Sequence, residues 1–166
     1  MTAEMRAIEI AGPSQISAKA AEEILRQLTR WFGIESALVE YARDAERLPN
    51  FIATLDQMPV GFLSMREHNP ATLEISCMAV ALDFHGQGIG SRLCEAAQSW
   101  WSGRGGRLLQ VKTLGPSRAN VDYARTRRFY ESRGFLPVEE FANLWAGNPC
   151  LLLVKPVGAS GPIARR

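Results

Sequence analysis

The chain has 166 residues, the length of one ordinary domain with a substantial hydrophobic core. Its composition, with 46% hydrophobic and 22% charged residues, is typical of a globular protein, and its formal net charge of +2 is too small to indicate a nucleic-acid-binding protein. The longest apolar runs, such as 78–82 and 150–154, are too short to span a bilayer, and the first residues show no signal-peptide pattern. We therefore expect a cytoplasmic protein whose partners include neither nucleic acid nor membrane.

In the first half of the chain we expect a strand, two helices and a β-hairpin. Gly12-Pro13 would close the strand, and Ser17 and Gly33 are the expected N-cap and stop of the first helix. Two apolar runs flank the turn-like residues 56–59, which predicts the hairpin. The expected ranges are 6–10 for the strand, 17–32 and 35–47 for the helices, and 51–55 with 60–66 for the hairpin.

The second half begins with an apolar strand, 73–82, that contains a single acid, Glu74. A helix follows the glycine-rich segment after it, and its expected apolar face consists of Ile89, Leu93, Ala96, Ala97 and Trp100. Beyond that helix we expect a strand at 107–111, a helix at 121–133, and strands at 135–141 and 150–155. This alternation of strands and helices predicts a mixed α/β sheet with crossover connections.

The three cysteines, Cys77, Cys94 and Cys150, are widely spaced, and each lies inside an apolar segment. An odd number with such spacing predicts reduced core residues and neither a disulfide framework nor a metal site. The chain has two histidines, His68 and His85, and no metal-ligand set can be assembled around them. We therefore expect no metal cofactor.

The segment His85 to Gly90, "HGQGIG", follows the buried strand and opens a helix at about Gly88. Glycines let the backbone approach a ligand closely, and the first N–H groups of a helix attract anionic oxygens. The segment is not a P-loop, because Ser91-Arg92 follows where Lys-Ser/Thr is required, and its spacing is not that of a dinucleotide-binding fingerprint. Two interpretations stay open on local grounds, namely a phosphate-binding loop and a tight strand-to-helix turn.

Two segments together resemble the GNAT superfamily of N-acetyltransferases. "HGQGIG" is similar to the family's pyrophosphate loop, Q/R-x-x-G-x-G/A, with His85 where Gln or Arg is usual. "RRFYESRGF", Arg127 to Phe135, is similar to its FYExxGF signature and lies about 40 residues later, in the family's order. The resemblance covers roughly residues 35–156.

The resemblance implies that acetyl-CoA is the co-substrate and that its diphosphate is held by the backbone of the glycine loop. It also implies that the preceding strand is bulged and bonds the pantetheine arm, with the N–H of Met78 nearest the thioester carbonyl, where a donor would stabilise the oxyanion. The cofactor-binding residues implied in this way are Met78, Ala79, Val80, His85, Gly86, Gln87, Gly88, Ile89, Gly90 and Ser91.

The resemblance also implies two catalytic side chains. Glu74, eleven residues before His85, is at the offset of a glutamate that takes a proton from the amine, and an apolar setting would raise the pKa of its carboxyl. Tyr130 is at the place of the tyrosine that protonates the departing thiolate. The alternatives are a solvated or ion-paired strand acid for Glu74 and, for Tyr130, a half-buried helix tyrosine that packs on the next strand. Tyr123 replaces the asparagine that many members use to contact the cofactor.

The implied fold is a single α/β (α+β) domain, residues 1–156, with a mixed and mostly antiparallel central sheet of about seven strands flanked by about four helices. Residues 157–166 have the composition of a flexible tail. The implied reaction is direct acetyl transfer to a primary amine of a small molecule or peptide. A non-catalytic acyl-CoA-binding module and a nucleotide-binding protein are the alternatives, and the acceptor, the acyl chain length and a homodimeric state stay open.

Overall fold

The computed structural model describes residues 7–158, which form seven strands and four α-helices. The strands are β1 (Glu9–Ser14), β2 (Asn50–Leu55), β3 (Met58–Asn69), β4 (Thr72–Val80), β5 (Leu108–Leu114), β6 (Leu136–Trp145) and β7 (Asn148–Pro156). The helices are α1 (Ala18–Leu25), α2 (Glu35–Arg47), α3 (Ile89–Gly103) and α4 (Val121–Ser132), and a 3-10 turn, η1 (Leu82–Phe84), precedes α3.

The seven strands form one sheet in the order β1-β2-β3-β4-β5-β7-β6. β4 and β5 are parallel, with Glu74 opposite Gln110, and α3 provides the crossover between them. The pairs β1–β2, β2–β3, β5–β7 and β6–β7 are antiparallel. The expected fold, a mixed and mostly antiparallel sheet with four helices, is therefore confirmed.

The residues form two compact units, within each of which contacts are dense. Among the described residues, the first contains 7–65 together with Cys77–Ala97, and the second contains Arg66–Ser76 and 98–158. β7 ends at Pro156, where we expect the domain to end, and the expected tail lies outside the described residues except for Val157 and Gly158.

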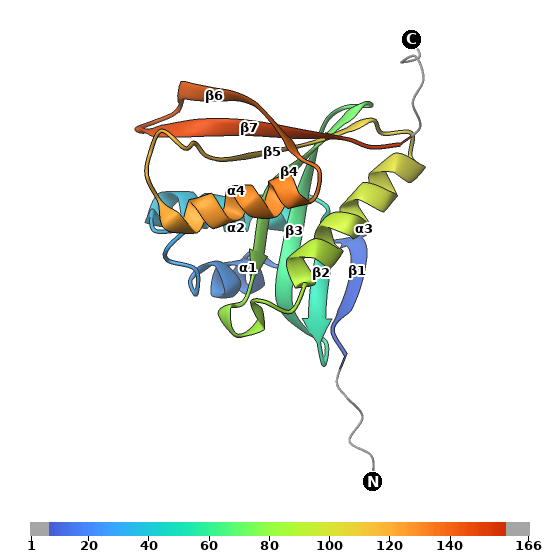
Figure 1. The fold of residues 1–166 in the computed structure, drawn as a ribbon. Coiled ribbons are helices and arrows are strands. Elements are labelled where there is room, and N and C mark those ends of the chain that lie inside the picture. The colour runs from blue at the N-terminus through green and yellow to red at the C-terminus, as the bar shows by residue number, and fades with distance from the viewer. Residues whose placement is uncertain (1–6, 159–166) are drawn as a thin grey trace. The chain divides into compact units, whose positions relative to one another are not determined.

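In the first unit α1 and α2 pack against each other, and their buried side chains form a core together with those of β2 and β3, which are neighbours in the sheet (Figure 1). Its buried side chains include Leu25, Leu38 and Ala42 from the helices and Ile52 and Phe62 from β2 and β3. Burying apolar surface of this kind is the main favourable term in folding. In the second unit β5, β7 and β6 lie side by side, and α4 contacts β5 (Figure 1).

The prediction of the first strand is wrong in its bounds, because β1 runs from Glu9 to Ser14 and continues through Gly12-Pro13. Proline has no N–H to donate to a ladder, and it is tolerated on an edge strand or at a bulge. β1 is at the edge of the sheet, and its register against β2 shifts between Ala11 and Ser14. Both conditions are therefore met.

The first helix is shorter than expected. Ser17 caps it as predicted, accepting a hydrogen bond from the Ala20 N–H, but α1 ends at Leu25 and turns follow in place of the expected helix to residue 32. Leu28 is nevertheless buried, and Trp31 packs against the same core. The apolar spacing correctly indicated which residues face the core, but turns with i to i+3 bonds satisfy that spacing as well as a helix does.

The other elements lie close to their predicted places, with small differences. α2 has the predicted bounds, and the hairpin turn is only Asp56-Gln57, both with positive φ, so that Met58 begins β3. In α3 the buried tryptophan is Trp101 and not Trp100, because the side chain that follows Ile89, Leu93 and Ala97 at four-residue steps is the one that faces the core.

Candidate active site

The strand–loop–helix segment of the first unit has the geometry of an anion site. β4 ends at Val80, η1 turns the chain, and the Arg92 N–H donates to the Gly88 carbonyl as α3 begins. The N–H groups before that bond belong to the first turn of a 15-residue helix, where donors and the helix dipole favour negative charge. The expected opening of this helix at about Gly88 is confirmed.

Two glycines of the loop have backbone conformations that side chains rarely adopt. Gly86 has φ of +75° and Gly88 has φ of +77°. A Cβ atom at either position would meet no heavy atom within 4 Å. The glycines are therefore required by backbone conformation and not by crowding, and the space beside them is open to a ligand.

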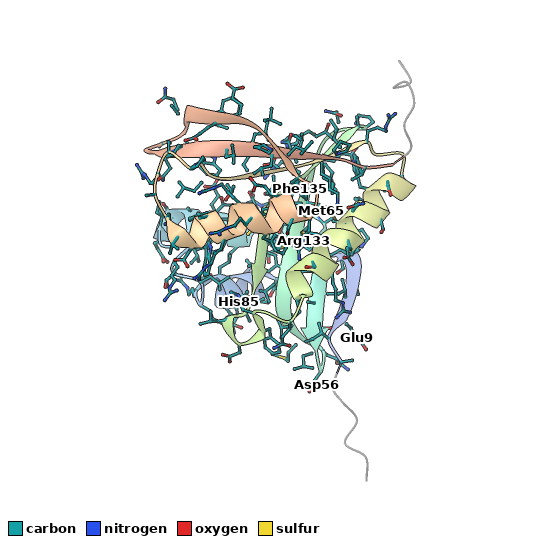
Figure 2. The ribbon with its side chains drawn as sticks, viewed as in Figure 1. Glu9, Asp56, Met65, His85, Arg133 and Phe135 are labelled. Atoms are coloured by element: carbon teal, nitrogen blue, oxygen red, sulfur yellow. The ribbon has the colours of Figure 1, made fainter. Side chains whose placement is uncertain are left out.

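The His85 side chain is turned back toward the strand. Its Nε2 forms a 2.7 Å hydrogen bond with the Val80 carbonyl, and its ring lies edge-on to Trp31 at 6.1 Å between centroids. Figure 2 shows His85 in the loop that leads into α3. The histidine that departs from the family's Gln or Arg thus links the loop to the end of β4 through its side chain.

Met78, Ala79 and Val80, the predicted pantetheine-binding residues, lie on the last part of β4. The Val80 carbonyl already accepts the His85 bond, and the Met78 sulfur is 3.7 Å from the Cys94 sulfur on α3. Ala79 is buried, and its carbonyl would be 3.2 Å from a Cβ placed on Gly61 of β3. Their role in binding a cofactor stays a prediction.

In the second unit Glu74 is the centre of a polar cluster. Its side chain is buried on β4, and its Oε2 is hydrogen-bonded to His68 Nε2 of β3. From β5, Lys112 Nζ donates to Oε1 at 3.1 Å and Gln110 Nε2 donates to Oε2 at 3.4 Å. Gln110 and Lys112 alternate with buried residues along β5, so strand geometry brings both to Glu74.

The pKa of Glu74 is shifted in the direction opposite to the one that we expect from the sequence. Burial alone would raise the pKa of this carboxyl, but hydrogen bonds from His68 and Lys112, with the charge of Lys112, outweigh burial and lower the pKa below its usual value. The expectation of a raised pKa is therefore wrong, because Lys112, 38 residues away, and His68, on the preceding strand, supply donors that an apolar strand does not reveal. The alternative of an ion-paired acid describes the ground state correctly.

Because of the ion pair between Lys112 and Glu74, we expect the stability of the protein to depend on pH. Because the folded pKa of Glu74 is lowered, its contribution is complete above the unfolded value near 4.5 and is lost as the pH falls through the folded pKa. Lys112→Met removes one cause of the lowering, so its melting temperature should lie below that of the wild type at pH 7, and the difference should shrink toward pH 3. Lys19→Met, at an exposed lysine of α1, is the control. A difference that stays constant with pH would contradict the linkage.

Tyr130 lies on α4 and is buried between two aromatic rings. The rings of Phe129 and Phe135 stand edge-on to it, at 5.2 and 5.3 Å between centroids. Gly134, with φ of +88°, follows the end of the helix, and Figure 2 shows Arg133 and Phe135 where the chain leaves α4. Phe135 is in the core, whereas Phe129 is only half-buried, and the Arg133 guanidinium lies over its ring at 3.8 Å from the centroid. The proton-donor role of Tyr130 stays a prediction.

Asn120 is the N-cap of α4, because its Oδ1 accepts hydrogen bonds from the N–H groups of Asp122 and Tyr123. A structural function therefore accounts for this asparagine, which lies outside the family's usual position.

The sequence did not point to the partners of Glu74. The signal that was available is that Gln110 and Lys112 are two polar residues at alternate positions of an otherwise apolar strand.

The three cysteines are buried, as predicted. Burial raises the pKa of Cys77 to about 12, which makes its thiol a poor nucleophile. Residues 7–158 contain no group of three or more His, Cys, Asp or Glu side chains placed to hold a metal ion. No helix in the same part of the chain is long and apolar enough to cross a membrane.

The family follows from a sequence model that matches the chain. The model of the GNAT acetyltransferase domain matches residues 46–137, more than half of the chain and a stretch that includes β4, the glycine loop and α4. The chain belongs to the GNAT acetyltransferase family. The enzyme class expected from the sequence, an acyltransferase of the EC 2.3.1 type, is thereby confirmed. No curated protein is matched by the sequence.

Solved structures of other GNAT proteins share the fold of this acetyltransferase. The ribosomal-protein-S18-alanine N-acetyltransferase from Escherichia coli has a TM-score of 0.75 at 19% identity, covering 96% of this chain and 100% of that one. A GNAT family acetyltransferase from Elizabethkingia anophelis with acetyl-CoA bound has a TM-score of 0.65 at 17% identity, covering 90% and 98%. An aminoglycoside 6'-N-acetyltransferase complexed with coenzyme A has a TM-score of 0.70 at 17% identity, covering 93% and 99%. At these identities the likeness concerns the fold.

Proposed function

We propose that this protein transfers the acetyl group of acetyl-CoA directly to a primary amine. The observation that supports the proposal best is the loop between β4 and α3, with positive φ at Gly86 and Gly88 and open space beside both. Such a loop at a helix N-terminus suits the diphosphate of coenzyme A. Two structures of the same fold were determined with acetyl-CoA or coenzyme A, which also supports this co-substrate.

In the proposed reaction the backbone of residues 85–91 holds the diphosphate and the backbone of residues 78–80 contacts the pantetheine arm. Glu74 and the side chains bonded to it form the cluster that removes the proton from the amine, and the Tyr130 hydroxyl protonates the departing thiolate. Deprotonation is needed because an ammonium nitrogen has no lone pair with which to attack the thioester. The three cysteines form no disulfide within residues 7–158, which is usual for proteins of a reducing compartment such as the cytoplasm.

The acceptor belongs to one of two chemical classes, a small-molecule amine or an amine of a peptide. Proteins of the same fold act on either class, since the E. coli structure is named for an alanine of a ribosomal protein and another for aminoglycosides. A panel of small amines, aminoglycosides and peptides with free N-termini, assayed for release of coenzyme A, distinguishes the two.

Acetyl-CoA is expected to stabilise the protein strongly. At about 100 times its dissociation constant it should raise the free energy of unfolding by roughly 2.7 kcal/mol, which a thermal-shift measurement detects. ATP and NAD are the control ligands, because a glycine loop used for a nucleotide would respond to them. If acetyl-CoA and coenzyme A leave the melting temperature unchanged while ATP or NAD raises it, the proposed function is wrong. Stabilisation without acetyl transfer to any amine would favour a non-catalytic acyl-CoA-binding module.

A further inference from the structure

The hydrogen bond between His68 and Glu74 determines which nitrogen of the histidine ring faces the carboxylate. His68 is on β3, six residues before Glu74 in the sequence, and the turn between β3 and β4 places the two side chains together. Its Nε2 lies against Glu74 Oε2, so the ring donates its Nε2–H to the carboxylate, and Nδ1 is the nitrogen that carries the lone pair whenever the ring is neutral. No other hydrogen bond to the His68 ring is present within residues 7–158.

The Glu74 carboxylate is poorly suited to take a proton itself. Its two oxygens receive hydrogen bonds from three side chains, and two of these, Lys112 and His68, lower its pKa despite burial. Only 11% of the Glu74 side chain is exposed, against 36% of the His68 side chain. An incoming amine therefore reaches the imidazole more easily than the carboxylate.

The cluster contains one side chain of the type that serves as a general base at neutral pH. Glu74 from β4 contacts His68, Lys112 and Gln110 from β5 contact the same Glu74 carboxylate, and Arg66, two residues before His68, is on the same face of β3. A lysine ammonium and an arginine guanidinium already carry their protons, and an amide does not titrate. An imidazole is the side chain best suited to neutral pH, and a carboxylate behind it stabilises the imidazolium that forms.

We propose that His68 accepts the proton that the acceptor amine loses and that Glu74 is the positioning residue that holds the His68 ring. This inference rests on the proposed acetyl transfer. Nδ1 takes one proton from the acceptor ammonium, and the freed nitrogen lone pair forms the C–N bond to the acetyl carbonyl carbon. The C–S bond breaks with its electron pair on sulfur, and the thiolate takes a proton from Tyr130. The second proton of the nitrogen returns the Tyr130 hydroxyl to its starting state through solvent, and His68 releases its own proton to solvent.

The test compares His68→Ala, His68→Gln, Glu74→Gln and the double variant His68→Ala/Glu74→Gln. General-base catalysis contributes about 100-fold to 10,000-fold, so His68→Ala should lower kcat by about 100-fold or more while the KM for acetyl-CoA stays unchanged. Tens of millimolar imidazole should restore part of the lost rate. The double variant should be no slower than His68→Ala, because the two residues act as one unit.

His68→Gln separates a base from a structural residue. Glutamine keeps a donor for Glu74 but has no basic nitrogen, so a merely structural histidine predicts a rate near that of the wild type, and a base predicts the loss seen in His68→Ala. Glu67→Gln, at the neighbouring exposed position of β3, is the control and should change nothing. The pH profile of kcat/KM should change shape in both His68 variants and keep its wild-type shape in Glu67→Gln.

Three results would overturn the inference. The first is a His68→Gln rate within a few-fold of the wild type, and the second is a failure of imidazole to raise the rate of His68→Ala that still binds acetyl-CoA. The third is a Glu74→Gln variant as slow as the double variant beside a nearly unaffected His68→Ala, which would make Glu74 the base. Each of these leaves acetyl transfer by the wild type intact. Absence of transfer by the wild type to any amine would instead overturn the proposed function, and this inference with it.

Discussion

Replacing Gly88 by valine is expected to weaken the binding of acetyl-CoA by at least about tenfold. Gly88 has φ of +77°, a conformation that costs a side-chain-bearing residue about 1–3 kcal/mol, and the cost is highest for a β-branched residue. The free loop can relax this strain, but a bound diphosphate requires the original backbone. The loss should therefore appear in the dissociation constant of acetyl-CoA, measured by calorimetry.

Gly105 provides the matched control for this experiment. It has φ of +82°, and like Gly88 it would place a Cβ atom with no heavy atom within 4 Å, but it follows α3 instead of preceding it. Gly105→Val should lower the melting temperature without changing the affinity for acetyl-CoA. Equal affinities of the two variants would show that the loop before α3 does not hold the diphosphate.

Phe135→Ala is expected to lower the free energy of unfolding by roughly 3–5 kcal/mol, the usual cost of removing a buried phenyl ring. Phe135 is among the largest fully buried side chains, and its ring packs edge-on against Tyr130. Because domains are stable by only about 5–15 kcal/mol, this is a large part of the total. Urea unfolding followed by circular dichroism measures it.

Phe129→Ala is the comparison that tests the burial argument. Phe129 has the same ring and also packs against Tyr130, but it lies on α4 and is half-buried beneath Arg133. The loss for Phe129→Ala should be clearly smaller than that for Phe135→Ala. Similar losses would mean that the half-buried ring on α4 contributes as much to stability as the fully buried ring after it.

The local elements of this protein can be predicted from its sequence where short-range rules dominate. α2 begins at Glu35 and ends at Arg47 as its apolar spacing predicts, and Gly134 stops α4 because glycine adopts positive φ without strain. The glycine loop between a buried strand and a helix was likewise predictable, since both its spacing and its position belong to neighbouring residues. Two such motifs in the family's order were sufficient to identify the family.

Elements that depend on distant partners could not be located in this way. α1 ends early at Leu25 although its apolar spacing continues, because turns bring Leu28 to the core as well as a helix would. β1 crosses Gly12-Pro13 because it is an edge strand, and a position at the edge is a property of the whole sheet. Periodicity therefore predicted burial more reliably than it predicted the bounds of elements.

The sequence by itself determined the family, the glycine loop and the position of Glu74 on an apolar strand. Each of these depends on residues that are close together along the chain. Only the tertiary structure decided the chemical state of that acid. Lys112 is 38 residues from Glu74 and His68 is on the preceding strand, and sheet pairing alone brings both to the carboxylate. A pKa depends on the charges and donors within a few ångströms, and the neighbours that set it here are neighbours in space.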